Sequence, residues 1–497
     1  MRPARAVAIP NQPSNRRHAK MLLPRYHHMG AILCLFLLLS LCLPHTAEAA
    51  GNFSFDMGKL GIAWIIPFVC MLLSIAIMPL AIPNIWHHHF GKISAGWGLA
   101  FLVPFMFASS FSHALYEFLH AMLLEYMPFI ILLLSLFTVA GGIRLKGSLV
   151  GTPKVNTGIL LIGTALASWM GTTGAAMLLI RPLIRANAHR TNKTHTVVFF
   201  IFLVANIGGS LTPLGDPPLF LGFLNGVPFF WTLTGLFLPM LVASLVLLAL
   251  YFCLDSYLYA KEGRPVPPDA NQGEKLGLEG TVNFILLAAI VGSVLLSGVW
   301  KSSVSCTIYH ITLELQNIVR DILLLCIAYV SWIVTSRESR RLNAFTWGPI
   351  EEVAKLFFGI FVSMIPAIAI LRAGKAGALS SVIDMVSRDG KPINAMYFWL
   401  TGGLSSFLDN APTYLVFFNT AGGNAAELTT TLAPTLIAIA AGAVFMGANT
   451  YIGNAPNFMV RSIAEEQGVP MPSFFGYMLW SCGILIPLFI ALTFIFF

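Results

Sequence analysis

The hydrophobic positions of this chain form long, nearly uninterrupted runs, unlike the short amphipathic stripes of a soluble protein. A run of roughly 20 apolar residues is long enough to cross a bilayer as a helix. Such runs predict ten membrane-spanning helices, at residues 60–82, 96–113, 123–142, 196–222, 228–253, 281–299, 320–335, 352–372, 431–458 and 474–497. The predicted fold class is therefore an all-α polytopic membrane protein.

Two further apolar segments carry a polar, Gly- or Pro-containing interruption at their middle. The segment 156–186 is interrupted at "SWMGTTGAAM", and the segment 393–423 is interrupted at "SSFLDNAPTY". Each half is about half a span long, which favours a re-entrant hairpin over a straight helix. Backbone broken at membrane depth is tolerated only where protein buries it or where it lines a wet cavity.

An internal repeat links these interruptions. A shift of 238 residues places "GSLTPLGDPPLF" (209–220) on "GANTYIGNAPNF" (447–458), with five identities in twelve positions. The same shift, without a gap, aligns the two hairpin interruptions. The sequence thus predicts a first transporter repeat at 55–255, a cytoplasmic linker at 256–280 and a second repeat at 281–497, each with five transmembrane helices and a hairpin, and with broken helices at the midplane.

An odd number of crossings per repeat predicts that the second repeat is inverted relative to the first. The positive-inside rule supports this topology. About fourteen Lys and Arg residues lie on one side, in loops near 84–94, 143–155, 185–195, 254–280, 336–350 and 461–473, against about six on the other. One loop does not follow this rule, because it carries Arg372, Lys375, Arg388 and Lys391 on the side with fewer Lys and Arg residues.

The amino-terminal residues 1–50 are typical of a signal peptide or signal anchor, with a basic stretch ending at Arg25, an apolar run and an A-x-A site ending at Ala49. The expected location is the bacterial inner membrane. The formal charge of +8 does not indicate nucleic acid, because six Lys and Arg residues lie in the first 25 and the rest are scattered through loops. The expected partners are the lipid bilayer and small ions, and a transported carboxylate is an alternative.

The breaks also predict a site. Interrupted helices expose carbonyl and amide dipoles at mid-membrane, and hard oxygen ligands beside them favour sodium or a proton over a soft metal. No cofactor other than these ions is expected. The candidate ion- or substrate-binding residues, all with oxygen-bearing side chains, are Thr172, Thr173, Asn206, Ser210, Thr212, Asp216, Asp409, Asn410, Thr413, Asn449, Thr450 and Asn454.

The two aspartates stand out, because an ionised Asp at the bilayer centre costs about 2.5–3.5 kcal/mol even on insertion scales that give low penalties. Sodium and a proton would compete for such a carboxylate. We expect Asp409 to be the principal cation and proton carboxylate and Asp216 to be a second or structural one. Asp216 also has the alternative of capping the half-helix that starts at Pro217.

These motifs resemble the ion-transporter superfamily, which includes citrate/metal carriers, CitMHS-like citrate carriers, divalent-anion/sodium symporters, arsenite permeases and NhaD-type sodium/proton antiporters. The resemblance covers residues 55–497. It implies a scaffold with a mobile transport unit, often in a homodimer. It implies sodium sites at Thr172 and Thr173 with 208–216, and at Asp409 and Asn410 with 447–454. The single sodium site that we expect consists of Asp409, Asn410 and Thr172.

The tip "LDNAPT" is similar to the antiporter and arsenite branches, whereas "GTTG" lacks the acidic residue found in several antiporter relatives. The primary hypothesis is therefore a secondary transporter that exchanges sodium or lithium for protons, and not an enzyme. The alternative is a sodium- or proton-coupled carrier of citrate, another carboxylate or an oxyanion. In that alternative Arg181 and the half-helix N-termini would attract the anion, although Arg181 and Arg185 also suit an interfacial anchor.

Overall fold

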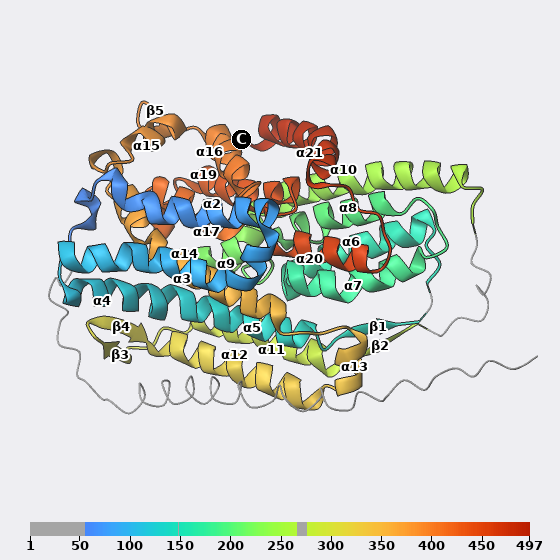
Figure 1. Cartoon of the computed structure of the whole chain (residues 1–497), viewed down its shortest axis with the longest axis horizontal. Helices are drawn as coiled ribbons and strands as arrows, with labels where there is room; N and C mark the ends of the chain where they lie inside the picture. Colours follow the sequence, from blue (N-terminus) through green and yellow to red (C-terminus); the bar gives the residue numbers. More distant parts are fainter. Residues whose placement is uncertain (1–54, 148, 266–275) are drawn as a thin grey trace, which may run out of the picture.

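The computed structural model describes residues 55–147, 149–265 and 276–497 (Figure 1). The predicted signal segment 1–50 lies outside these residues. The described part contains 8 helices that are long and apolar enough to cross a membrane. They are Ile62–Ala81 (which includes α2, Ile66–Ala81), α3 (Pro83–Ala108), Phe111–Ala140, α10 (Trp231–Lys261), α11 (Val282–Val299), α12 (Leu315–Val334), α14 (Gly348–Arg372) and α21 (Phe474–Phe496). The chain is an all-α multi-span membrane protein, as predicted.

Several predicted boundaries are wrong: the span predicted at 96–113 ends at Ala108, and the span predicted at 123–142 already begins at Phe111. Residues 84–94 were expected to form a loop, but α3 begins at Pro83 and runs through them without a break. Pro83 occupies the first helical turn, where its fixed φ favours the helix and its missing N–H costs nothing. Hydropathy detects the apolar part of a helix and not its polar end, so the sequence "NIWHHHFGK" hid this extension. In the same way, α10 continues to Lys261 and takes up the start of the predicted linker at 256–280.

The span Phe111–Ala140 is a single long helix with an irregular centre. It consists of α4 (Phe111–His120), a π-helical stretch η3 (Ala121–Tyr126) and α5 (Met127–Ala140). Pro128 lies in the first turn of α5. The π-helical stretch packs against α14, so the irregularity lies inside the protein.

Both predicted interruptions are present as helix pairs. The first pair is α6 (Pro153–Met170) and α7 (Thr172–Ala186), and the second is α16 (Asn394–Ser405) and α17 (Asn410–Thr420). The helix α6 has 18 residues, more than the expected half span. Its first turn is stabilised by Thr152, whose side chain accepts a hydrogen bond from the N–H of Val155.

The two predicted broken helices are also observed. The first consists of α8 (Thr194–Leu203), the short turn η4 (Ile207–Ser210) and α9 (Pro217–Leu224), and the second of α19 (Ala433–Met446), η6 (Gly447–Asn449) and α20 (Ala455–Glu466). Residues 195–203 of α8 are all buried. A helix that is apolar all round belongs in a core, and α8 and α19 accordingly bring both breaks into the interior.

Short elements mark the two ends of the bundle. The strands β3 (Ser305–Ile308) and β4 (Ile311–Glu314) form an antiparallel pair at one end, and β1 (Arg144–Lys146) pairs with β2 (Gly277–Glu279) at the opposite end (Figure 1). The remaining elements are η1 (Met57–Lys59), η2 (Ile62–Ile65), α13 (Arg337–Leu342), η5 (Gly374–Ala376), α15 (Ser380–Val386), β5 (Ser387–Arg388), β6 (Lys391–Pro392) and α18 (Ala425–Leu428).

A buried ion-pair cluster ties the base of the first helix pair to α10. The guanidinium of Arg190 lies 2.6 Å from a carboxylate oxygen of Asp255, and neither side chain is exposed. The same oxygen lies 2.9 Å from Nε2 of His195. Asn156 and Tyr251 donate hydrogen bonds to the other carboxylate oxygen, each over 3.1 Å. A buried carboxylate needs such partners, and here those of Asp255 fix α6, α8 and α10 together.

Candidate functional site

The tip of the first helix pair is a single glycine that allows a sharp reversal. Gly171 has a φ of 81°, a conformation that side chains other than that of glycine rarely adopt. Directly after it, the backbone N–H of Thr172 donates to the carbonyl of Gly215, over 2.9 Å. The tip of α6–α7 therefore contacts the unwound part of the first broken helix.

The tip of the second pair is longer and carries a charge. Asp409 is the N-cap of α17, and its carboxylate accepts a hydrogen bond from the backbone N–H of Ala411, over 3.0 Å. Thr413 donates its hydroxyl to the backbone carbonyl of Asp409, over 2.9 Å. The "DNAPT" motif is thus a capped helix start.

The backbone geometry of the two breaks repeats with the 238-residue offset. Thr212 donates to the carbonyl of Ser168, and Thr450 donates to the carbonyl of Ser406. The N–H of the residue two positions later returns to the threonine hydroxyl over 3.2 Å in both cases. In each half, therefore, the helix before the tip is bonded to the break in the same way.

Glycines at both breaks have no room for a side chain. A Cβ on Gly215 would lie 2.1 Å from the carbonyl oxygen of Gly209, and a Cβ on Gly453 would lie 2.6 Å from that of Gly447. Both distances are well below van der Waals contact. The Gly identities that revealed the repeat are thus required by the close backbone approach inside each break.

Asp216 is the residue at which all four interruptions meet. One carboxylate oxygen accepts from the hydroxyl of Thr172 and from the amide of Asn454, each over 3.1 Å. The other accepts from the amide of Asn410. The side chain is buried and occupies the N-cap position of α9, but it makes no capping hydrogen bond there. Its donors come instead from both tips and from the second break.

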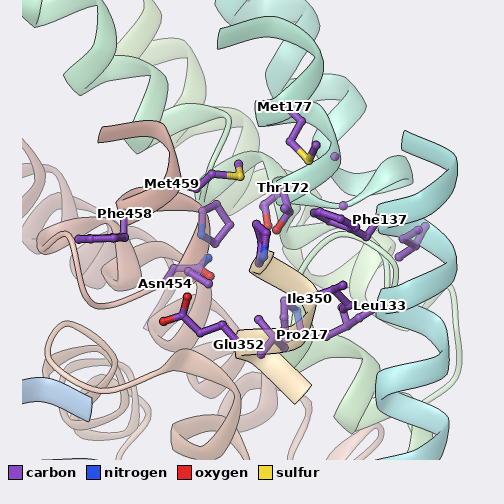
Figure 2. A pocket seen from close by; sticks show the side chains of 18 of the residues that line it. Leu133, Phe137, Thr172, Met177, Pro217, Ile350, Glu352, Asn454, Phe458 and Met459 are labelled. Atoms are coloured by element: carbon purple, nitrogen blue, oxygen red, sulfur yellow. The ribbon is translucent and has the colours of Figure 1, made fainter. Parts of the chain in front are cut away.

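A cavity of about 540 Å³ lies beside this meeting point. Figure 2 shows Thr172, Asn454 and Glu352 around the central space, with Phe137 and Leu133 on another wall. The four half-helices α7, α9, α17 and α20 each begin at this cavity, since Thr172, Pro217, Asp409 and Ala455 line it. Helix α14, together with α2, α3 and α5, closes the other side.

The predicted site residues divide into two groups. Those that line the cavity are Thr172, Thr173, Asp216, Asp409 and Asn454. Those that lie outside its lining, mostly buried around the breaks and tips, are Asn206, Ser210, Thr212, Asn410, Thr413, Asn449 and Thr450. Within the expected sodium set, Thr172 and Asn410 both bond to Asp216, whereas the carboxylate of Asp409 accepts from the backbone of its own helix.

Several residues of this region were missed by sequence reasoning. Ser168 and Ser406 hold the breaks through their carbonyls, and their spacing of 238 residues could have identified them. Asn457 accepts from the amide of Asn206 over 2.7 Å and so joins the two breaks. Glu352 and His87 line the cavity from α14 and α3, although the sequence indicated only a helix start for Glu352 and an interfacial turn for His87.

Two amide oxygens beside the second tip and break lack partners. The Oδ1 atoms of Asn410 and Asn449 are buried and accept no hydrogen bond from the residues that the structure describes. Their amide nitrogens are engaged, by Asp216 and Ser406 respectively. A buried acceptor without a donor costs free energy unless a cation or water fills the gap. Within the described residues, no group of three or more His, Cys, Asp or Glu side chains could hold a metal ion.

Comparison with known proteins identifies one family. A family model described as "Putative citrate transport" matches residues 57–497, which include both helix pairs and both broken helices. No curated protein matches the chain.

Proposed function

This chain belongs to the citrate transport family whose model it matches, and from that premise we propose that it is a sodium-coupled carrier of citrate or a related carboxylate. The observation that carries the proposal is the cavity at which four half-helices begin beside the buried carboxylate of Asp216. A volume of about 540 Å³ falls within the roughly 300–1,000 Å³ of small-molecule sites.

The cation is assigned to the second half, beside the tip residue Asn410 and the break residue Asn449. The unpaired oxygens of Asn410 and Asn449 are hard, neutral ligands of the kind that sodium prefers. Asn410 also bonds to Asp216, so a cation at its oxygen would lie one side chain away from a carboxylate. The negative charge of Asp216 would favour that cation.

The anion is assigned to the helix N-termini, which do not all offer the same groups. A helix start presents backbone N–H donors and a positive dipole to an anion. Helix α9 starts with Pro217 and Pro218, which have no N–H to donate. Helix α7 starts with Thr172, whose N–H and hydroxyl already donate within the first break, and with Thr173, which offers both its N–H and its hydroxyl. The carboxylate substrate is therefore placed nearer to α7 than to α9.

The inverted arrangement of the repeats is part of this proposal. The strands β1 and β2, next to the base of α6–α7, lie at one end of the bundle (Figure 1). The strands β5 and β6 immediately precede α16, and α15 lies toward the other end (Figure 1). Helix pairs that enter from opposite ends suit alternating access around a fixed site. The bacterial inner membrane and a homodimer complete the proposed setting.

Sodium/proton antiport is the second candidate, favoured by one observation. Asp216 is an intramembrane carboxylate on a break, and such a group suits a competition between sodium and a proton. The family description names citrate, so the carrier is the primary proposal.

Reconstitution into proteoliposomes separates the two candidates. Labelled citrate should accumulate when sodium is added outside and should not accumulate with choline. An internal pH dye in the same vesicles reports exchange. Proton release on sodium addition, with no uptake of citrate or of other carboxylates, would contradict the carrier proposal and support antiport.

A further inference from the structure

Among the described residues, the cavity is lined by one arginine, Arg181, which the sequence suggested as an anion partner or an interfacial anchor. Arg181 lines the cavity from α7 and is half-buried. Within the part of the chain that the structure describes, its guanidinium makes no hydrogen bond or ion pair, and Glu466 and Arg185 are the charged groups that influence it. An arginine at membrane depth usually pairs with a charge. Here the place of that partner is open to the cavity.

The position of Arg181 separates it from the meeting point at Asp216. Gly174, Met177 and Arg181 form one stripe along α7, spaced three and four residues apart, and all three line the cavity. Arg181 follows Thr172 by nine residues, which is about 13 Å of helix rise at 1.5 Å per residue. The backbone of Arg181 therefore lies about two and a half helical turns from the tip of α7.

The wall of the cavity that α14 forms carries an acidic side chain, so a cation at Arg181 would help to bind an anion. Glu352 lines the cavity from α14, so an incoming polyanion meets a negative charge as well as an apolar surface. Arg181 is the one arginine that lines this cavity. The electrostatic attraction between Arg181 and a ligand increases with the number of negative charges on the ligand, whereas contact with the apolar wall does not depend on that number.

We propose that Arg181 forms a separate anion site toward the end of the cavity remote from the helix-pair tips, and that this site selects carboxylates of higher charge. This inference rests on the proposed carrier function. The site binds one carboxylate group of a di- or tricarboxylate through the guanidinium fork before the ligand reaches the tip of α7.

Arg185 provides a matched control. It lies one helical turn after Arg181, does not line the cavity, and donates to the carbonyl of Leu145 over 3.3 Å. Arg185→Gln therefore removes the same charge from the same helix without touching the cavity. Arg181→Lys keeps the charge but loses the fork.

The test compares binding of citrate, succinate and acetate to the detergent-purified full chain, by competition against labelled citrate in sodium buffer. Arg181→Gln should weaken citrate by about tenfold and succinate by about threefold, with acetate within about twofold, because the lost attraction scales with ligand charge. Arg181→Lys should keep the preference for citrate over acetate but not the full citrate affinity, because the charge remains and the fork is lost. Arg185→Gln should change no affinity by more than about twofold.

Each outcome decides the inference. An equal loss for all three anions, or no loss, overturns the separate site while leaving the carrier proposal in place. If the wild-type chain binds no carboxylate, both proposals fail. Should Arg181→Gln not fold, Arg181→Lys remains informative: equal affinities of the Lys variant and wild type for every anion at both low and high salt would overturn the requirement for the guanidinium.

Discussion

The two halves of the molecule share a backbone device but distribute their charges in opposite ways. In the first half the tip is the neutral Gly171 and the break carries Asp216, whereas in the second half the tip carries Asp409 and the break carries the neutral Asn454. The hydrogen bonds from Thr212 and Thr450 are equivalent. The comparison teaches that close backbone packing fixes both breaks, while the position of the carboxylate differs between the halves.

The bases of the two helix pairs also differ in charge. Arg190, Asp255 and His195 form a buried ionic cluster in the first half. In the second half, the residues equivalent to Asn156 and Asp255 form neutral contacts: Asn394 accepts from Thr435 over 2.8 Å, and Thr493 accepts from Trp399 over 3.0 Å. The first pair is therefore held by charge and the second by neutral hydrogen bonds and apolar packing.

The largest effect is expected from adding a side chain at a glycine where the backbone of the first break is closely packed. Gly215→Ala places a Cβ 2.1 Å from the carbonyl oxygen of Gly209, a backbone atom that cannot move aside. We expect a cost above about 4 kcal/mol and loss of folded protein, measured by size-exclusion chromatography of the detergent extract. Gly453→Ala, with its nearest atom at 2.6 Å, should be less severe.

The control for this change is Gly403→Ala. Gly403 lies within α16 with no atom within 4 Å of an added Cβ. Alanine is the better helix former by roughly 1 kcal/mol, so folded yield should be kept or raised. Equal yields of the Gly215 and Gly403 variants would show that the close approach in the first break is not required.

The next effect concerns the base of the first helix pair. Asp255→Asn removes the nearer counter-ion of the buried Arg190 and leaves only Glu262, at 3.6 Å, and should lower the free energy of unfolding by about 3 kcal/mol. Thr435→Val in the second half removes one neutral hydrogen bond and should cost about 1 kcal/mol. Denaturant unfolding of both variants in the same detergent measures the two losses of unfolding free energy. Equal losses would remove the distinction between the bases of the two helix pairs.

Substitution of the two carboxylates should cost less free energy, and its effect should appear in the rate of transport. Asp216→Asn removes the charge that orients Asn410 and Asn454, and should reduce sodium-driven citrate uptake by about 100-fold, the upper end for residues behind ion ligands. Asp409→Asn keeps an effective N-cap and should reduce uptake by about tenfold or less. The reverse order would favour Asp409 as the principal carboxylate, as the sequence suggested.

Much of this architecture could be predicted because it depends on local sequence. Apolar runs predicted the spans, and Gly and Pro residues predicted both tips and both breaks. The polar end of α3, at Pro83–Gly91, could not be predicted because hydropathy does not follow a helix beyond its apolar part. The interpretation of Asp216 as a helix cap identified its position correctly but not its partners.

The arrangement of the site was harder to predict because its contacts are distant in sequence. Asp216 meets Thr172, Asn410 and Asn454 across 44, 194 and 238 residues. The last of these separations equals the repeat offset, so that contact joins equivalent positions of the two halves. Glu352 reaches the cavity from α14, and only the packing of α14 against α17, α3 and α5 reveals it.

The most direct measurement of the central claim is the mutual dependence of sodium and citrate binding. Coupling between two sites must be reciprocal, so sodium should raise the affinity for citrate by the same factor by which citrate raises the affinity for sodium. Calorimetric titration of the purified chain with each ligand, with and without the other, should give equal factors of about tenfold or more. Citrate affinity that does not change between sodium and choline would contradict a sodium-coupled carrier.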